Sequence, residues 1–259
     1  MFENRVKTLL AEGRTALGVA LPDASDLLAR FSIDCGIDFL WIDLEHRPYG
    51  PNEVRNVPIM CRQKDCVPLI RVPNLDPGHI KQSLDIGASA IMVPQVDNAE
   101  QARRAVEYAK YPPEGSRGVS PLWTAMMGVS WNDYLPVANQ ETCVIVQIES
   151  PDGIRNLDEI AAVEGVDIVF AGPADLSASL GVIGQLGHPK VEKLLEEFPA
   201  RIAAHGKAAG ITFGSVDRCA LAIEQGYRLV NFGSVAQLGT IGITAELARL
   251  RKLADQQTG

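Results

Sequence analysis

Short apolar runs alternate with longer amphipathic stretches along the whole chain, and this alternation constrains the fold more than any other feature of the sequence. Runs of this length between helical patterns are typical of the strands of a parallel sheet. The pattern predicts strands at Ala16–Leu21, Phe39–Leu44, Val67–Val72, Ala90–Val93, Cys143–Ile148, Ile168–Ala171, Gly210–Phe213 and Leu229–Phe232. This is the number of strands that a closed (β/α)8 barrel needs, so we expect a TIM barrel.

Helical patterns fill the segments between the expected strands. Examples are Asp23–Ile33, Asn98–Lys110 and Val191–His205, and Asp23 and Asn98 are suited to N-capping. The one long irregular stretch that we expect runs from Tyr111 to Pro136, and a loop of that length in a compact domain is usually functional. No linker divides the chain, so residues 1–259 are expected to form a single domain.

Composition excludes several classes of protein. The formal net charge is −8 and no basic run stands out, so we expect neither nucleic acid nor an anionic membrane as a partner. The chain has five cysteines and none is spaced as a zinc or redox pair, which favours a reduced, cytoplasmic compartment. The N-terminal residues lack the continuous apolar core of a signal peptide, and no later segment reaches the ~18 apolar residues of a membrane span.

Polar side chains follow several of the expected strands directly, at the pole where the chemistry of a barrel belongs. Among them are Glu149 and Asp175, which follow neighbouring strands. Charged groups at the ends of apolar strands are costly to desolvate and favour a ligand or an ion as partner. Paired carboxylates suit a hard cation such as Mg²⁺ or Mn²⁺. A salt bridge at the base of a loop is the alternative interpretation.

Two other residues at the same pole have side chains suited to catalysis. An imidazole can exchange protons near neutral pH, so His46 is a candidate base, although a surface or packing histidine is the alternative. Arg71 ends an apolar strand, so its guanidinium should emerge at the mouth and bind a carboxylate in a bidentate manner. Its alternative role is a structural ion pair with Glu45 or Asp43.

The segment that follows the sixth expected strand reads as a tight turn entering a short helix. Gly172 and Pro173 form the turn, and the backbone N–H groups that follow it are candidates to bind a substrate carboxylate. The alternative is a capped helix start, with Asp175 as the cap.

Taken together, these segments resemble the class II, metal-dependent 2-oxo-acid aldolases of the HpcH/HpaI aldolase/citrate lyase type, which include 4-hydroxy-2-oxoheptanedioate aldolase and 2-dehydro-3-deoxyglucarate aldolase. The resemblance covers nearly the whole chain. Its most specific segments are Asp43–Pro48, Ile80–Ala88, Tyr111–Val119, Val146–Glu149, Val163–Asp167 and Gly172–Ser177. It implies a barrel of the phosphoenolpyruvate/pyruvate superfamily type. It also implies reversible cleavage of a 4-hydroxy-2-oxo acid to pyruvate and an aldehyde, through a pyruvate enolate held on a divalent cation.

The resemblance also implies roles for individual residues. Glu149 and Asp175 would bind the cation (Mg²⁺, Mn²⁺ or Co²⁺), and Arg71 would contact the keto-acid oxygen and steady the enolate. His46 would act as, or alongside, the base, paired with Asp85 of a neighbouring subunit. Substrate-binding positions would include Gln147, Gly172, Pro173, Ala174 and Ser177. Members of this family are typically hexamers built from dimers, with the C-terminal helix exchanged between subunits, so we expect a homo-hexamer (a trimer of dimers).

Departures from the family pattern concern the aldehyde half of the substrate. Thr124 stands where relatives often carry an arginine that meets that end, and Val235 stands where they often carry an aspartate. Both replacements put an acidic, sugar-derived substrate in doubt, but not the pyruvate half. One role for the neighbouring residues is direct stacking on the substrate. The alternative is packing within the loop or a subunit contact, for Trp123, Met126 and Met127.

Other functions remain alternatives. The same enolate chemistry serves an oxaloacetate decarboxylase or an acyl-CoA ester lyase, although the sequence shows no basic patch for the phosphates of CoA. A barrel that binds a metabolite without catalysis is the third possibility. The joint presence of His46, Arg71, Asp85, Glu149 and Asp175 argues against it, because a scaffold has no physical need for that set.

Overall fold

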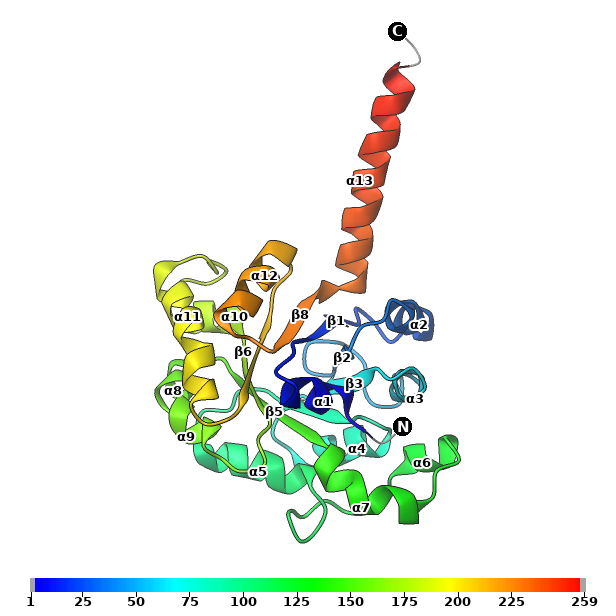
Figure 1. Cartoon of the computed structure of the whole chain (residues 1–259), viewed down its shortest axis with the longest axis vertical. Coiled ribbons are helices and arrows are strands. Elements are labelled where there is room, and N and C mark those ends of the chain that lie inside the picture. The colour runs from blue at the N-terminus through cyan, green and yellow to red at the C-terminus, as the bar shows by residue number, and fades with distance from the viewer. Residues whose placement is uncertain (1–2, 257–259) are drawn as a thin grey trace.

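Eight parallel strands close into a barrel in sequence order, so the predicted TIM barrel is confirmed (Figure 1). The computed structural model of the chain describes residues 3–256. The strands are β1 (Ala16–Ala20), β2 (Phe39–Asp43), β3 (Val67–Arg71), β4 (Ala90–Val93), β5 (Cys143–Ile148), β6 (Ile168–Ala171), β7 (Ala208–Thr212) and β8 (Leu229–Ser234). The seventh strand begins two residues earlier than the sequence predicts, because Ala208 and Ala209 pair with Ile168 and Val169 of β6.

Helices lie before, between and after the strands, and those between successive strands form the outer ring. They are α1 (Arg5–Ala11), α2 (Asp26–Asp34), α3 (Val57–Arg62), α4 (Pro77–Asp85), α5 (Ala99–Ala109), α6 (Leu122–Met126), α7 (Trp131–Glu141), α8 (Pro151–Arg155), α9 (Leu157–Ala161), α10 (Pro173–Ser179), α11 (Pro189–Ala203), α12 (Val216–Gln225) and α13 (Val235–Gln256). Asn98 caps α5 as predicted, with its side chain accepting a hydrogen bond from the backbone N–H of Gln101.

Three expectations about helices need correction. The segment 111–136 is not irregular, because it contains α6 and the start of α7. Pro136 lies inside α7 and is normally a helix breaker, which hid this helix in the sequence. Asp23 is not the cap of α2: Ser25 is, and Asp23 instead accepts a hydrogen bond from the Ser25 N–H. The helix expected at 191–205 spans 189–203, since Pro189 fits the first helical turn.

The hydrophobic core has two main parts that the barrel wall separates. One lies inside the barrel and includes Phe39, Trp41 and Phe170, and α1 closes its lower end with Val6 and Leu9. The other lies between the strands and the surrounding helices. Polar groups on inward-facing positions near the strand ends therefore sit over an apolar floor.

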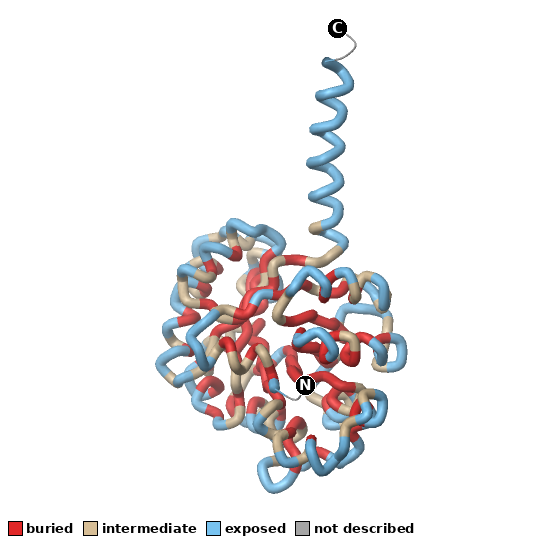
Figure 2. Tube along the Cα trace, turned by 45° about the vertical axis from the view of Figure 1, so that its right-hand side comes forward, coloured by how far each residue is buried: buried red, intermediate tan, exposed pale blue. Residues whose placement is uncertain are grey.

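The last helix departs from the ring. α13 leaves the barrel after β8 and projects away from it (Figure 1), and it is exposed along almost its whole length (Figure 2). Ile243, Leu247 and Leu250 form an apolar stripe at helical spacing and are 71%, 43% and 60% exposed. No helix within residues 3–256 is long and apolar enough to cross a membrane.

Candidate active site

Arg71 is the central cation of the barrel mouth, and two acidic side chains hold it. Its Nε donates to Asp43 Oδ1 at 2.9 Å and its Nη2 donates to Asp43 Oδ2 at 2.7 Å. Its Nη1 lies 3.0 Å from Glu45 Oε2. Asp43 and Arg71 are paired in the register of β2 and β3, so the parallel sheet itself sets this bidentate geometry. The structural ion pair considered for Arg71 is therefore present with both candidate partners.

An aromatic floor supports the guanidinium of Arg71. Its Cζ lies 4.9 Å from the centroid of the Trp41 ring, which packs edge-on against Phe170 with centroids 5.5 Å apart. Contact with an aromatic face stabilises a cation and restricts its orientation. Arg71 is thus fixed by ion pairs on one side and by an aromatic ring on the other.

Glu149 is a buried carboxyl group without a hydrogen-bond partner for one of its oxygens. It follows β5, is 8% exposed, and its Oε1 has no partner among the described residues. Burial raises the pKa of Glu149 to about 8, and the nearby charges of Asp175 and Glu45 add to the effect while Arg71 opposes it. Such a carboxylate is costly unless a positive charge reaches it.

Asp175 is the acidic neighbour of Glu149 and lies exposed in the first turn of α10. It does not cap that helix, because Gly172 is the N-cap residue and no side chain caps the helix by a hydrogen bond. Gly172 packs tightly against the site: a Cβ built there would lie 2.8 Å from Glu149 Cγ and 3.0 Å from Gln147 Nε2. Glycine at this position therefore lets the turn approach both side chains.

A divalent cation fits this pair of carboxylates. Residues 3–256 contain no cluster of three or more His, Cys, Asp or Glu side chains arranged to enclose a metal. An open site with two carboxylate ligands, completed by water and substrate oxygens, is nevertheless typical of Mg²⁺ and similar hard cations. The unpartnered, buried Oε1 of Glu149 is the atom in the site that such a cation would compensate.

His46 and Asp85 do not meet within one chain. His46 is exposed at the mouth, with Nε2 3.7 Å from Glu45 Oε2. Asp85 ends α4, which runs from the mouth back toward the opposite pole, and it pairs with Arg117 Nη2 at 2.7 Å. Burial raises the pKa of Asp85 above its ordinary value, although Arg117 opposes the shift. Any pairing of His46 with Asp85 therefore needs a second subunit.

Other residues predicted for the site have defined positions. Gln147 is buried, and its Oε1 accepts a long hydrogen bond of 3.5 Å from Arg71 Nη1. Ser177 is fully buried, and its hydroxyl donates to Ala174 O at 2.6 Å and accepts from Gly184 N at 2.9 Å. Both hydrogen bonds of this hydroxyl are local, so they stabilise the turn after α10.

The two positions that depart from the family pattern also have defined surroundings. Thr124 is buried, and its hydroxyl donates to Pro121 O and accepts from Trp131 Nε1. Trp123 packs in the same small core as Tyr134, which fits the packing role considered for it. Val235 begins α13 and is half-buried.

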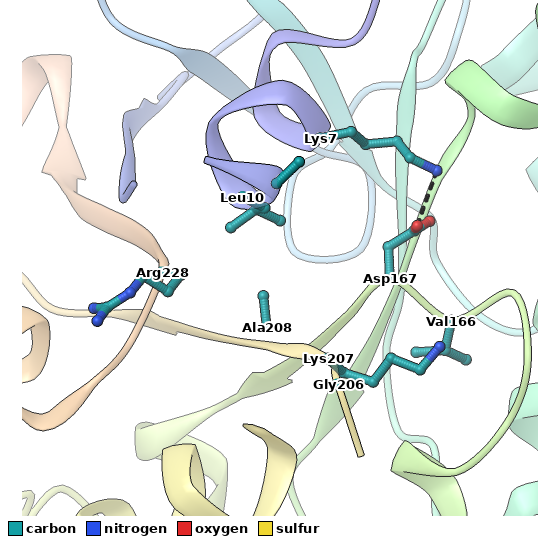
Figure 3. A pocket seen from close by; sticks show the side chains of 9 residues that line it. Lys7, Leu10, Val166, Asp167, Gly206, Lys207, Ala208 and Arg228 are labelled. Atoms are coloured by element: carbon teal, nitrogen blue, oxygen red, sulfur yellow. Dashed lines mark ion pairs between the residues drawn. The ribbon is translucent and has the colours of Figure 1, made fainter. Parts of the chain in front are cut away.

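A cavity of about 340 Å³ lies at the opposite pole of the barrel, away from these residues. Lys7, Asp167 and Arg228 are among its lining residues, and Lys7 Nζ lies 2.9 Å from Asp167 Oδ1 (Figure 3). The Arg228 guanidinium points away from this ion pair (Figure 3). In this cavity Lys7 and Asp167 neutralise each other and Arg228 points away from them (Figure 3). At the mouth, by contrast, the acidic side chains converge on Arg71.

From the sequence, Asp43 and Glu45 are expected only as ion-pair partners of Arg71, and Trp41 is not expected at the site. All three belong to the site, through the contacts with Arg71 described above. A signal was available in the period of two along β2, which places Trp41 and Asp43 on the same inward face.

The family profile described as HpcH/HpaI aldolase/citrate lyase matches residues 17–239. The chain belongs to this family. The family expected from the sequence is therefore confirmed.

Similar HpcH/HpaI relatives include two proteins named as aldolases. A "hydroxypyruvate/pyruvate aldolase" of Roseobacter denitrificans is 42% identical over 228 residues, which cover 88% of this chain and 89% of the relative. A "2-keto-3-deoxy-L-rhamnonate aldolase" of Salmonella gallinarum is 36% identical over 100% of this chain and 97% of the relative. A solved HpcH/HpaI aldolase/citrate lyase family structure from Burkholderia cenocepacia superimposes with a TM-score of 0.89 at 33% identity, covering 96% of this chain and 99% of that one.

Proposed function

We propose that the chain is a divalent-metal-dependent aldolase, a carbon–carbon lyase that reversibly cleaves a 4-hydroxy-2-oxo acid to pyruvate and an aldehyde. Membership of the HpcH/HpaI family and the aldolase names of both relatives support this activity. The observation that carries the proposal is the buried, unpartnered carboxyl oxygen of Glu149, beside Asp175 and within electrostatic reach of the clamped cation of Arg71.

The chain's own side chains support each part of this chemistry. Glu149 and Asp175 would hold Mg²⁺, Mn²⁺ or Co²⁺, which when bound would polarise a keto group as a Lewis acid. Arg71 is fixed in place, so it offers a positive charge at no reorganisation cost where negative charge develops on the keto oxygen. Gln147 and the turn at Gly172, Pro173 and Ala174 border the same place and are the proposed contacts for the substrate carboxylate.

We propose that His46 acts as the base in proton transfer. Its ring is 60% exposed at the mouth, so it is free to reach the C4 hydroxyl of a bound hydroxy-oxo acid and remove its proton during cleavage. Asp85 would reach His46 from a neighbouring subunit, because the two residues lie at opposite poles of one barrel. Ser177 supports the turn from behind through its two local hydrogen bonds.

Deuterium exchange into the methyl group of pyruvate tests the half-reaction without any knowledge of the aldehyde. We expect exchange, followed by NMR, with Mn²⁺, Mg²⁺ or Co²⁺, no exchange with a chelator, and a fall of about 1000-fold in Glu149→Gln. Mn²⁺ binding measured by electron paramagnetic resonance should weaken in the same variant. Absence of exchange in a protein that binds Mn²⁺ would overturn the aldolase proposal.

We further infer that α13 is exchanged between subunits of a homo-hexamer built as a trimer of dimers. Its apolar stripe is exposed, and because it leaves the ring, the outward-facing Leu17 of β1 is also 38% exposed. Exposed apolar surfaces of this kind mark association sites. If two copies of the chain exchange α13, the apolar stripe of this helix and the exposed surface at Leu17 would both be covered.

Light scattering on the purified protein tests the exchange. Leu247→Glu with Leu250→Glu should give a particle smaller than the wild type, because two charges enter the apolar stripe. Arg249→Glu and Lys252→Glu change charges on the opposite side of the same helix and form the matched control. An unchanged mass in the leucine variant contradicts the exchange.

The remaining expectations stay predictions. We propose that residues 1–259 form one barrel domain, with α13 as its exchanged arm. A cytoplasmic location is compatible with the five cysteines, all of which are free within the described residues.

A further inference from the structure

A polar pair faces Arg71 from the opposite wall of the barrel. Thr212 ends β7 and Asn231 lies on β8, and the two are paired in the strand register. Both point inward, because they are two residues along from Gly210 and Leu229, and Leu229 belongs to the inner core. In a closed barrel of eight strands β7 lies across from β3, which carries Arg71.

The register places these side chains in the layers that fill a barrel of this type, each contributed by alternate strands. The layer at the mouth contains Ala20, Arg71, Gln147 and Thr212. The layer beneath it contains Trp41, Met92, Phe170 and Asn231. Asn231 is therefore an amide in a layer otherwise made of apolar and aromatic side chains.

The hydrogen bonds of Asn231 fix the orientation of the Thr212 hydroxyl. Asn231 Nδ2 donates to Thr212 Oγ1 at 2.9 Å and to Gly233 O at 3.2 Å. A carbonyl oxygen only accepts, so the bond to Gly233 settles which end of the amide is nitrogen. The Thr212 oxygen thus accepts a bond from behind, and no described residue accepts its hydroxyl proton.

The cost of this arrangement points to a ligand. Asn231 is 2% exposed, and its Oδ1 is buried without a hydrogen-bond partner among the described residues. A buried unpaired amide oxygen is unfavourable, and an apolar side chain would fill this layer at lower cost. This unfavourable amide is found where its nitrogen orients the half-buried hydroxyl of Thr212 at the mouth.

We propose that Thr212, oriented by Asn231, binds a substrate hydroxyl group that lies on one of the two carbons joined by the aldolase or on the carbon adjacent to them. This inference rests on the proposed aldolase function. Around the mouth Arg71 is on β3, Glu149 follows β5, Asp175 follows β6, and Thr212 is on the next strand. A ligand that extends from Arg71 past the two carboxylates meets the Thr212 hydroxyl, so hydroxylated substrates are preferred over their deoxy analogues.

Two substrate positions present this chemistry, and the experiment separates them. The first is a hydroxyl on C3 of the 2-oxo acid, tested by comparing deuterium exchange at C3 of 3-hydroxypyruvate and pyruvate without any aldehyde. The second is the α-hydroxyl of the aldehyde, tested by comparing pyruvate condensation with glycolaldehyde and acetaldehyde. The protein is the full-length wild type with Mn²⁺, and the readout is the ratio of kcat/KM for each hydroxylated and deoxy pair.

Thr212→Val removes the hydroxyl at constant shape. We expect one of the two ratios to fall by roughly 3- to 10-fold, the worth of one neutral hydrogen bond. Thr212→Ser keeps the hydroxyl and should restore most of that ratio. Thr8→Val removes a hydroxyl at the far pole, where Thr8 bonds Asn4 and Glu3, and is the matched control.

The outcomes are distinct. A fall only in the acid ratio assigns the hydroxyl to C3 of the oxo acid, and a fall only in the aldehyde ratio assigns it to the aldehyde. If both ratios stay at the wild-type value in Thr212→Val, the inference is wrong while the aldolase function stands. If wild-type protein exchanges neither acid, the proposed function itself fails.

Discussion

The two ends of the barrel use carboxylates in opposite ways. At the lower pole Asp38 and Asp167 each have both oxygens satisfied, one by a cation on α1 and the other by a backbone N–H of a neighbouring strand. At the mouth Glu149 is more buried than either of them, and one of its oxygens has no hydrogen-bond partner. The lower carboxylates therefore fasten α1 to the barrel, whereas Glu149 costs stability and is suited to binding a cation.

The largest effect should come from Glu149→Gln, which removes the buried, unpartnered carboxyl group from the mouth. We expect metal-dependent exchange of pyruvate protons to fall by about 1000-fold, the upper range for loss of an electrostatic contact in an active site. The metal-free variant should melt no lower than wild type, because no partner is lost. If the variant unfolds more easily or keeps its exchange rate, then Glu149 does not differ from the stabilising carboxylates of the lower pole in the way that we infer. NMR exchange and thermal melting in chelator measure the two quantities.

Arg71→Lys should give the next largest effect. Lysine keeps the charge but loses the bidentate bonds to Asp43 and the planar contact with Trp41. We expect kcat/KM for cleavage to fall by about 100-fold, with Mn²⁺ affinity nearly retained. Equal losses in Mn²⁺ affinity and kcat/KM would show instead that Arg71 supports the carboxylates rather than the substrate.

Asp43→Asn should lower the free energy of unfolding by about 2 kcal/mol at neutral pH, since it weakens a buried pair. Burial opposes ionisation of Asp43, but the hydrogen bonds and charge of Arg71 outweigh it and hold its pKa below the ordinary value of 3.8. A lowered pKa contributes stability that is full above the ordinary value and is lost as pH falls through the folded-state pKa.

The difference in stability between wild type and Asp43→Asn should therefore narrow below about pH 4. Urea unfolding at several pH values measures it. A difference that is constant between pH 7 and pH 3 would mean that the charge of Asp43 does not stabilise the fold.

Lys7→Met should have the smallest effect. The Lys7–Asp167 pair at the lower pole is partly exposed, so its loss should cost only about 0.5 kcal/mol. Pyruvate exchange should stay at the wild-type rate, because the pair is at the far end of the barrel from Arg71. Urea unfolding and the NMR exchange assay provide the two values, and a clear loss of exchange would show that the two poles are coupled.

Local sequence pattern was sufficient for the strands and for the residues at their ends. Apolar runs that end in polar groups identified Arg71, Glu149 and Asp175 as neighbours at one pole, because the C-terminal ends of parallel strands share an edge. The local pattern did not predict the helices of residues 111–136. Pro136 lies inside α7 and is unfavourable in a helix, but the cap at Ser130 and packing against Trp123 stabilise α7.

Contacts between residues far apart in sequence needed the folded chain. Asp43 and Arg71 meet because β2 and β3 are paired in a particular register. The sequence of one strand alone does not determine that register. The same is true of Thr212 and Asn231 on β7 and β8. The separation of His46 from Asp85 follows from the direction of α4 relative to the closed barrel.

The sequence by itself determined the barrel class, the family and the pole at which polar side chains follow the strands, because strand periodicity and strand-end polarity are local properties of the chain. Only the tertiary structure decided that Arg71 is clamped, that one oxygen of Glu149 is left without a partner, and that α13 leaves the ring. These features depend on register, burial and closure, which arise when distant segments pack together and exclude water from the groups between them.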